Sequence, residues 1–214
     1  MVRSVSSEFL GTLLLLATVV GSGIMGESLS GGNVAIALLA NAMATGAMLF
    51  VLINVFGPVS GAHFNPAVTL AMAANGRLPA RQVVPYVLAQ AAGAIAGVIL
   101  AHAMFDQPLM QISAKLRWGT GQWVAEATAT FGLLLTILAV LRHKPEAIPQ
   151  AVALYIVGAY WFTASTSFAN PAVTIARSLS NSFAGIAPSC VLPFIAAQAA
   201  GAVIAVLVAR RLIQ

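Results

Sequence analysis

Charged residues and cysteine are both scarce in this chain. Only 7% of its 214 residues are charged, ten Lys or Arg and five Asp or Glu, whereas about a quarter of a typical soluble domain is charged. A water-soluble enzyme of this size could not cover its surface with so few charges. The 60% hydrophobic content also excludes intrinsic disorder, which requires low hydrophobicity and high net charge. The composition therefore predicts a protein whose solvent is a lipid bilayer.

Cys190 is the single cysteine, and it lies in an apolar segment. One cysteine excludes a disulfide within the chain, and no nearby base marks it as a nucleophile, so we interpret it as a packing residue. His102 and His143 lack metal-ligand spacing, and we interpret His63 as structural. We therefore expect no catalytic residue, no cofactor and no bound metal, and the protein is not predicted to be an enzyme.

Six apolar stretches are long enough to cross a membrane, which takes about 20 residues per helix. Two further segments, at about 65–77 and 170–182, are shorter and open with Asn-Pro-Ala, a sequence that suits the first turn of a helix. Arg3 before the first stretch also fits a cleaved signal peptide, but Glu8 interrupts that stretch, so we expect a retained span. The six predicted spans are about 5–26, 33–56, 81–103, 122–141, 148–166 and 188–209.

The chain contains an internal repeat. PYVLAQAAGAIAGVILA at 85–101 returns as PFIAAQAAGAVIAVLVA at 193–209, EFLGT at Glu8 matches EATAT at Glu126, and NPAVT occurs at Asn65 and again at Asn170. Each half, 1–105 and 122–214, reads as three spans and one half-helix, so the second half must enter the membrane from the opposite side. This inverted repeat places a pathway between the halves. We predict an all-α membrane protein, a single channel domain over 1–214, with six transmembrane helices and two re-entrant half-helices.

The basic residues lie at segment ends, which indicates membrane topology and not a nucleic-acid partner. Seven of them would lie on the inner side if both termini are cytoplasmic, against Lys115 and Arg117 on the outer side. We expect a multi-pass protein of a bacterial inner membrane with both termini in the cytoplasm. The seven are Arg3, Arg77, Arg81, Arg142, Lys144, Arg210 and Arg211.

Two half-helices that enter from opposite faces would meet near the middle of the membrane. Each N-terminus carries a partial positive charge of roughly half a unit, and non-helical backbone at that depth must line a cavity or be buried in protein. Asn65 and Asn170 can donate amide N–H groups into the lumen while their carbonyls cap the helices. Such a site offers donors to a neutral polar solute and repels cations.

SGAHFNPAVTLA and SFANPAVTIAR, with the repeated E-x-x-x-T pairs, resemble the aquaporin (major intrinsic protein) family over essentially the whole chain. The resemblance implies a six-helix bundle with a pore in each subunit of a homotetramer. It also implies that Glu8 and Glu126 brace the re-entrant loops, although an ionisable residue in a span also fits a proton relay. The implied NPA motifs are Asn65, Pro66, Ala67 and Asn170, Pro171, Ala172, and the implied pore-lining carbonyls are those of Gly61, Ala62, His63, Phe64, Thr166, Ser167 and Phe168.

By the same resemblance, the selectivity filter falls on Thr45, Gly158 and Ser167, with Val173 where the family usually has Arg. Val173 supplies neither donors nor charge, and the other three are small or short. We therefore predict a wide, uncharged filter that passes polyols such as glycerol, urea, and trivalent metalloid hydroxides such as arsenite and antimonite. The alternatives are an ordinary water and glycerol channel with a relaxed filter, a secondary transporter, and a junctional protein.

Three residues near the outer side are left open by the sequence. Arg177 lies four residues beyond Val173 on the same helical face, where it could place a positive charge in the outer vestibule or point towards the loop or the lipid headgroups. Tyr160 and Trp161 could anchor the protein at the membrane interface or constrict the vestibule.

Overall fold

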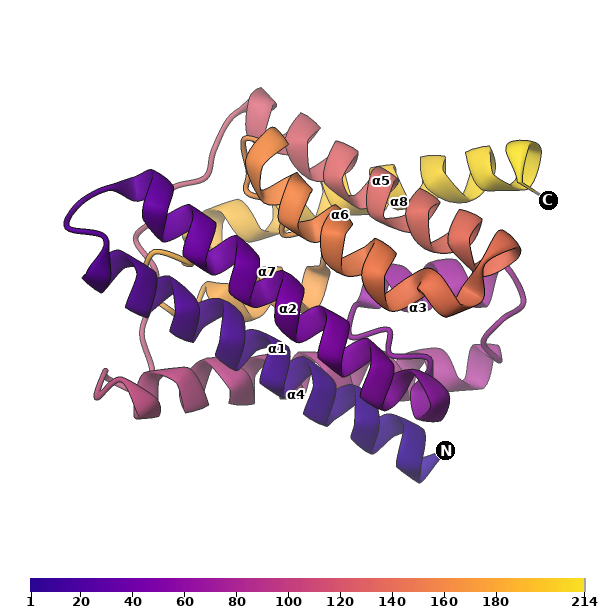
Figure 1. Cartoon of the computed structure of the whole chain (residues 1–214), viewed down its shortest axis with the longest axis horizontal. Helices are drawn as coiled ribbons and strands as arrows, with labels where there is room; N and C mark the ends of the chain where they lie inside the picture. The colour runs from indigo at the N-terminus through magenta and orange to yellow at the C-terminus, as the bar shows by residue number, and fades with distance from the viewer. Residues whose placement is uncertain (214) are drawn as a thin grey trace.

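The computed structural model describes residues 1–213 and folds them into a bundle of helices (Figure 1). Two 3₁₀ turns, Pro145–Ala147 and Pro188–Cys190, lead into the last two long helices. Both termini lie at the same end of the bundle, as an even number of crossings requires. The α-helices are α1 (Val2–Leu29), α2 (Val34–Ser60), α3 (Pro66–Ala74), α4 (Ala80–Met104), α5 (Thr120–His143), α6 (Ile148–Phe162), α7 (Pro171–Arg177) and α8 (Val191–Leu212).

Five helices have the length and hydropathy of membrane spans: α1, α2, α4, α5, and α8 with its preceding turn. Helix α6 has only 15 residues and rises about 22 Å, which is short of the roughly 30 Å hydrocarbon core. The predicted span 148–166 is therefore helical only to Phe162, and an irregular segment carries the chain on to Asn170. The predicted all-α membrane fold is confirmed, with the fifth crossing shorter than expected.

The two half-helices begin where the Asn-Pro sequences predict. Asn65 and Asn170 are the N-caps, and their side-chain oxygens accept the N–H groups of Ala67 (2.9 Å) and Ala172 (3.0 Å). Both half-helices end earlier than predicted, since α3 stops at Ala74 instead of 77 and α7 at Arg177 instead of 182. Figure 1 shows them in the middle of the bundle, among the longer helices.

The longer helices approach one another most closely at glycines. Helix α1 packs against α4, and α5 packs against α8 in the same way. A Cβ atom on Gly93 would lie 2.3 Å from the carbonyl oxygen of Phe9, and one on Gly201 would lie 2.1 Å from that of Ala127. Only glycine permits backbones to pack at this distance, the behaviour of small residues at membrane helix interfaces. The two halves of the molecule therefore pack their long helices through equivalent glycine contacts, α1 on α4 and α5 on α8.

Candidate functional site

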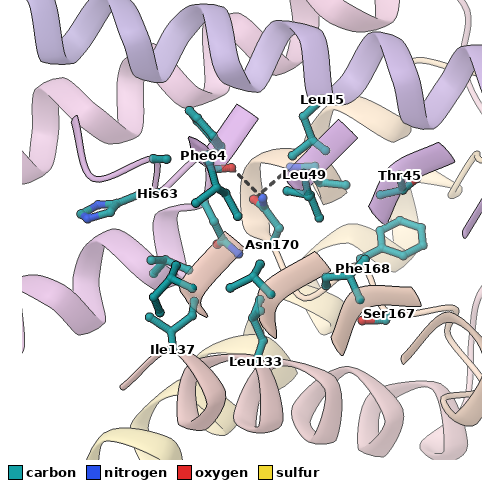
Figure 2. A pocket seen from close by; sticks show the side chains of 18 of the residues that line it. Leu15, Thr45, Leu49, His63, Phe64, Leu133, Ile137, Ser167, Phe168 and Asn170 are labelled. Atoms are coloured by element: carbon teal, nitrogen blue, oxygen red, sulfur yellow. Dashed lines mark hydrogen bonds between the residues drawn. The ribbon is translucent and has the colours of Figure 1, made fainter. Parts of the chain in front are cut away.

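A cavity of about 170 Å³ lies between the two halves of the molecule. Its wall has two characters. The re-entrant segments 61–64 and 167–168 bring backbone polar groups to it, while α1, α2, α5 and α6 bring aliphatic side chains (Figure 2). The cavity is therefore mostly apolar, and the re-entrant segments contribute to its few polar groups. The aliphatic wall includes Leu15, Val19, Leu49, Ile53, Leu133, Ile137, Val152 and Ile156.

Asn65 and Asn170 both line this cavity, and each is 5% exposed. Asn65 Nδ2 donates to the carbonyl of Ala169 at 2.8 Å. In the same way, Asn170 Nδ2 donates to the carbonyl of Phe64 at 2.8 Å, as Figure 2 shows. Each side-chain amide thus donates one of its two N–H groups to a carbonyl of the opposite half. The sequence predicted amides that face the lumen, and both asparagines line the cavity.

The re-entrant segments have an unusual backbone. Several non-glycine residues adopt positive φ, a conformation that persists only where surrounding structure holds it. All four residues predicted on the inner side, Gly61, Ala62, His63 and Phe64, line the cavity. On the other side Ser167 and Phe168 line it, whereas Thr166 does not reach it. The non-glycine residues with positive φ in these segments are Ala62, Phe64, Thr166, Ser167 and Ala169.

Glu8 holds the first re-entrant segment from behind. Its carboxylate is buried and accepts the backbone N–H groups of His63 (2.9 Å) and Phe64 (2.7 Å), the hydroxyl of Ser60 (2.6 Å) and the amide of Gln90 (2.8 Å). Bonds of this kind to a carboxylate are stronger than neutral ones.

Glu126 does the same in the second half. It accepts the N–H groups of Phe168 (2.8 Å) and Ala169 (2.9 Å) and the amide of Gln198 (2.6 Å). Gln198 also donates to Thr174 at 2.9 Å, as Gln90 does to Thr69 at the same distance. Because all these partners are donors, the geometry favours the bracing interpretation over a proton relay.

At the end of the cavity near Thr45, which we call the outer end after the predicted orientation, one filter residue is misplaced by the sequence. Thr45, Ser167 and Val173 line the cavity, but Gly158 does not. The α6 residues that line it include Val152, Ile156 and Tyr160, four apart on one face, so Gly158 points the opposite way. Gly158 was assigned by its position twelve residues before Asn170, which presumes that the segment between α6 and Asn170 has the same length in every member of the family.

Tyr160 occupies the place predicted for Gly158. Its hydroxyl lies 3.3 Å from the Oγ1 atom of Thr45, across the cavity wall. Trp161, by contrast, is 49% exposed and belongs to the outward face of α6. The structure therefore separates the two aromatic residues that the sequence left undecided, and it makes the outer end narrower than a glycine would.

Arg177 reaches the cavity. Its side chain is 2% exposed, lines the outer end and donates from Nε to the carbonyl of Ala184. The guanidinium carbon lies 3.4 Å from the centroid of the Phe168 ring, within cation–π range. The side chain thus contacts both the following loop and the cavity, and the predicted alternative in which it reaches the headgroups is wrong.

Sequence reasoning missed Arg117, which it treated only as a charge that reports topology. This residue lies in the loop between α4 and α5, yet it is 8% exposed. It donates to the carbonyls of Gly185 (2.9 Å) and Ser165 (3.1 Å), and its guanidinium carbon lies 4.9 Å from the Phe168 centroid. No local signal distinguishes it from a loop cation, because its burial depends on how the loop folds back.

Comparison with known proteins gives a consistent picture. The family described as Major intrinsic protein matches residues 1–162. Aquaglyceroporin AqpS of Rhizobium meliloti (strain 1021) is 55% identical over 99% of this chain and 91% of its own length. A glycerol uptake facilitator protein of Streptococcus pneumoniae (strain ATCC BAA-255 / R6) is 35% identical over 65% of this chain and 64% of its own.

The fold is also similar to a solved structure. The X-ray structure of the aquaglyceroporin from Plasmodium falciparum superposes with a TM-score of 0.78 at 22% sequence identity, covering 99% of this chain and 96% of that one. At this identity the likeness concerns the fold alone.

Proposed function

The chain belongs to the major intrinsic protein family, whose members are membrane channels for small solutes and not enzymes, and we propose that it passes small uncharged polyols and trivalent metalloid hydroxides. Glycerol represents the first class, and arsenite and antimonite in their neutral hydroxide forms represent the second. Both present hydroxyl groups that exchange hydrogen bonds, and neither carries a charge that the half-helix N-termini would repel or trap.

The observation that carries this proposal is the make-up of the cavity wall, which is mostly aliphatic and holds a few polar groups. A polyol has hydroxyl groups that can bond to the re-entrant carbonyls and to the remaining amide N–H groups of Asn65 and Asn170, and it has C–H groups that pack on the aliphatic wall. Few precisely placed polar groups in a mostly apolar cavity are typical of small-molecule sites. Two of the relatives, an aquaglyceroporin and a glycerol uptake facilitator, support the same substrate class.

The proposed filter comprises Thr45, Tyr160, Ser167 and Val173. Ser167 Oγ is buried and finds no hydrogen-bond partner within residues 1–213, so it is free to bond to a solute hydroxyl. Val173 adds neither a donor nor a charge at this level, and the charge of Arg177 lies about one helical turn farther out. This combination favours solutes larger than water that carry several hydroxyl groups.

Two other functions can be set against this one. Tyr160 at the outer end favours an ordinary water and glycerol channel, because it fills space that a glycine would leave open. A secondary transporter needs charged coupling groups, and the carboxylates of Glu8 and Glu126 already accept hydrogen bonds from the re-entrant segments and from Gln90 and Gln198. Flux that follows the solute gradient in both directions without proton dependence supports a channel, whereas saturable, proton-coupled uptake would contradict it.

The filter proposal is tested by Val173→Arg. Val173→Met is the control, because methionine is also a long side chain but carries no charge. Water, glycerol and arsenite permeation are measured in proteoliposomes. We expect Val173→Arg to lower glycerol and arsenite flux by on the order of tenfold, since an Arg both narrows the filter and adds a fixed charge, and Val173→Met to lower them less. Unchanged glycerol and arsenite flux in Val173→Arg would refute the filter argument.

We also propose a homotetramer in a bacterial inner membrane, with both termini cytoplasmic and the halves 1–105 and 122–214 as the inverted repeats. The shared end of the two termini (Figure 1) and the concentration of Lys and Arg at that end support this orientation. The corresponding networks of Glu8 and Glu126 support the repeat. Labelling of single cysteines introduced near each terminus tests the orientation, and the mass of the detergent-solubilised protein tests the tetramer.

A further inference from the structure

The segment that joins the two halves folds back over the outer end of the pore. Ser113 N–H donates to the carbonyl of Ser178 at 2.9 Å, and Ala187 N–H donates to the carbonyl of Lys115 at 2.7 Å. Ala114 N–H donates to Asn181 Oδ1 at 3.0 Å. These bonds attach residues 113–117 to the loop that follows α7, and they carry the side chain of Arg117 into the protein interior.

The guanidinium groups of Arg117 and Arg177 both lie over the ring of Phe168, at 4.9 Å and 3.4 Å from its centroid. The ring itself is held in place, because its backbone N–H bonds to Glu126 and its edge packs on Phe194 with centroids 5.3 Å apart. Phe168 and Arg177 line the outer end of the cavity. Two positive charges from distant parts of the chain are thus held around one residue of the pore wall.

Both guanidinium groups are held by neutral partners. The hydrogen bonds of Arg117 go to the carbonyls of Gly185 and Ser165, and that of Arg177 goes to the carbonyl of Ala184. Carbonyl dipoles fix the position of a cation without cancelling its charge. Burial lowers the pKa of Arg117 to about 10, with Glu126 as the main opposing influence, so the side chain stays protonated at neutral pH.

We propose that Arg117 is a second charge that determines selectivity, and that it acts with Arg177 as a barrier to cations at the level beyond Val173. The inference rests on the proposed channel function. A cation that enters the outer end is repelled by two like charges in a region of low dielectric, whereas a neutral polyol is not repelled. At an effective dielectric of about 20, a like charge on the order of 10 Å from a passing cation lowers its passage by about tenfold or more.

The test compares Arg117→Met, which removes the charge, with Arg117→Lys, which keeps it. Potassium leak and glycerol flux are measured on the same proteoliposomes, and the leak is expressed relative to the glycerol flux. Arg117→Gln replaces Arg117→Met if the latter does not fold, because its amide can still donate to one of the two carbonyls. Arg81→Met removes an exposed cation at the start of α4 and serves as the matched control.

We expect the ratio of potassium leak to glycerol flux to rise about tenfold in Arg117→Met, to stay within about threefold of wild type in Arg117→Lys, and to be unchanged in Arg81→Met. A wild-type ratio in Arg117→Met overturns the inference. An equal rise in Arg117→Lys and Arg117→Met also overturns it, because the residue would then act by packing and not by charge. Absence of glycerol flux in the wild-type protein is a separate result that contradicts the proposed function itself.

Discussion

Glu126 offers the most direct test of how the re-entrant segments are held. In Glu126→Gln one carboxylate oxygen becomes an NH₂ group, which cannot accept a hydrogen bond. The native carboxylate accepts the N–H of Phe168 through Oε1, and those of Ala169 and Gln198 through Oε2. The amide oxygen can replace only one of these two oxygens, so at least one backbone N–H of the pore wall faces a donor.

The magnitude follows from those contacts. Losing one hydrogen bond to a charged group removes roughly 1.5–3 kcal/mol, and leaving its buried donor without a partner adds about 1–3 kcal/mol. Relief of the desolvation of a buried carboxylate offsets part of this loss. We expect the free energy of unfolding to fall by about 3 kcal/mol, which for a chain of this size lowers the melting temperature by about 6–12 °C.

Thermal unfolding in detergent and glycerol flux in proteoliposomes measure the effect. Glu8→Gln is the equivalent change in the other half and should give a similar shift, while Glu27→Gln, at an exposed position near the end of α1, should shift the melting temperature by about 1 °C or less. If Glu126→Gln has the same melting temperature as the wild type and the same glycerol flux, the bracing role is refuted. Normal stability combined with loss of a proton-dependent component of transport would instead favour the relay.

Further outcomes are expected elsewhere in the molecule. Gly201→Ala should lower the melting temperature, because the new Cβ would lie 2.1 Å from a carbonyl oxygen of α5 and overpacking costs about 1–3 kcal/mol or more, whereas Gly121→Ala, where a Cβ meets nothing within 4 Å, should not. Tyr160→Ala should increase the flux of larger polyols by opening the outer end, and Gly158→Ala should leave it unchanged. Burial, and then Arg117 and Arg177, lower the pKa of Lys115 to about 8 against the opposing charge of Glu27, so this side chain loses its positive charge as the outer pH rises from 7 to 9. Cation leak should therefore increase over that interval in the wild type and show no such step in Lys115→Met.

The starts of the half-helices and the pairing of the two halves could be predicted from the sequence. Their signals are local or repeated. An asparagine is a favourable N-cap and a proline suits the first position of a helix, and the matching motifs at Asn65 and Asn170 imply matching positions in the two halves. The ends of the half-helices were placed too late, although polar residues follow both helices, Asn75 after α3 and Ser178 after α7. Gly76, with φ of +70°, follows α3 after Asn75 and is a local stop signal.

The outer end of the site was harder to predict because it depends on the path of loops. Gly158 was chosen by counting along a segment whose length varies independently of the helices, and a shift of two residues on α6 turns a side chain to the opposite face. Arg117 could not be found in this way at all. Its neighbours Phe168 and Gly185 are about 50 and 70 residues distant in the chain, and they meet it only because the connecting segment folds inward.

The exchange of hydrogen bonds between the two asparagines also has a consequence for biogenesis. When the first half of the chain leaves the ribosome, the amide of Asn65 has no Ala169 carbonyl to bind, and the carbonyl of Phe64 has no Asn170 amide. The first re-entrant loop therefore reaches its final state only after the seventh helix of the chain has been synthesised and has entered from the other side. The centre of the pore wall is thus completed by contacts that neither half of the chain can make alone.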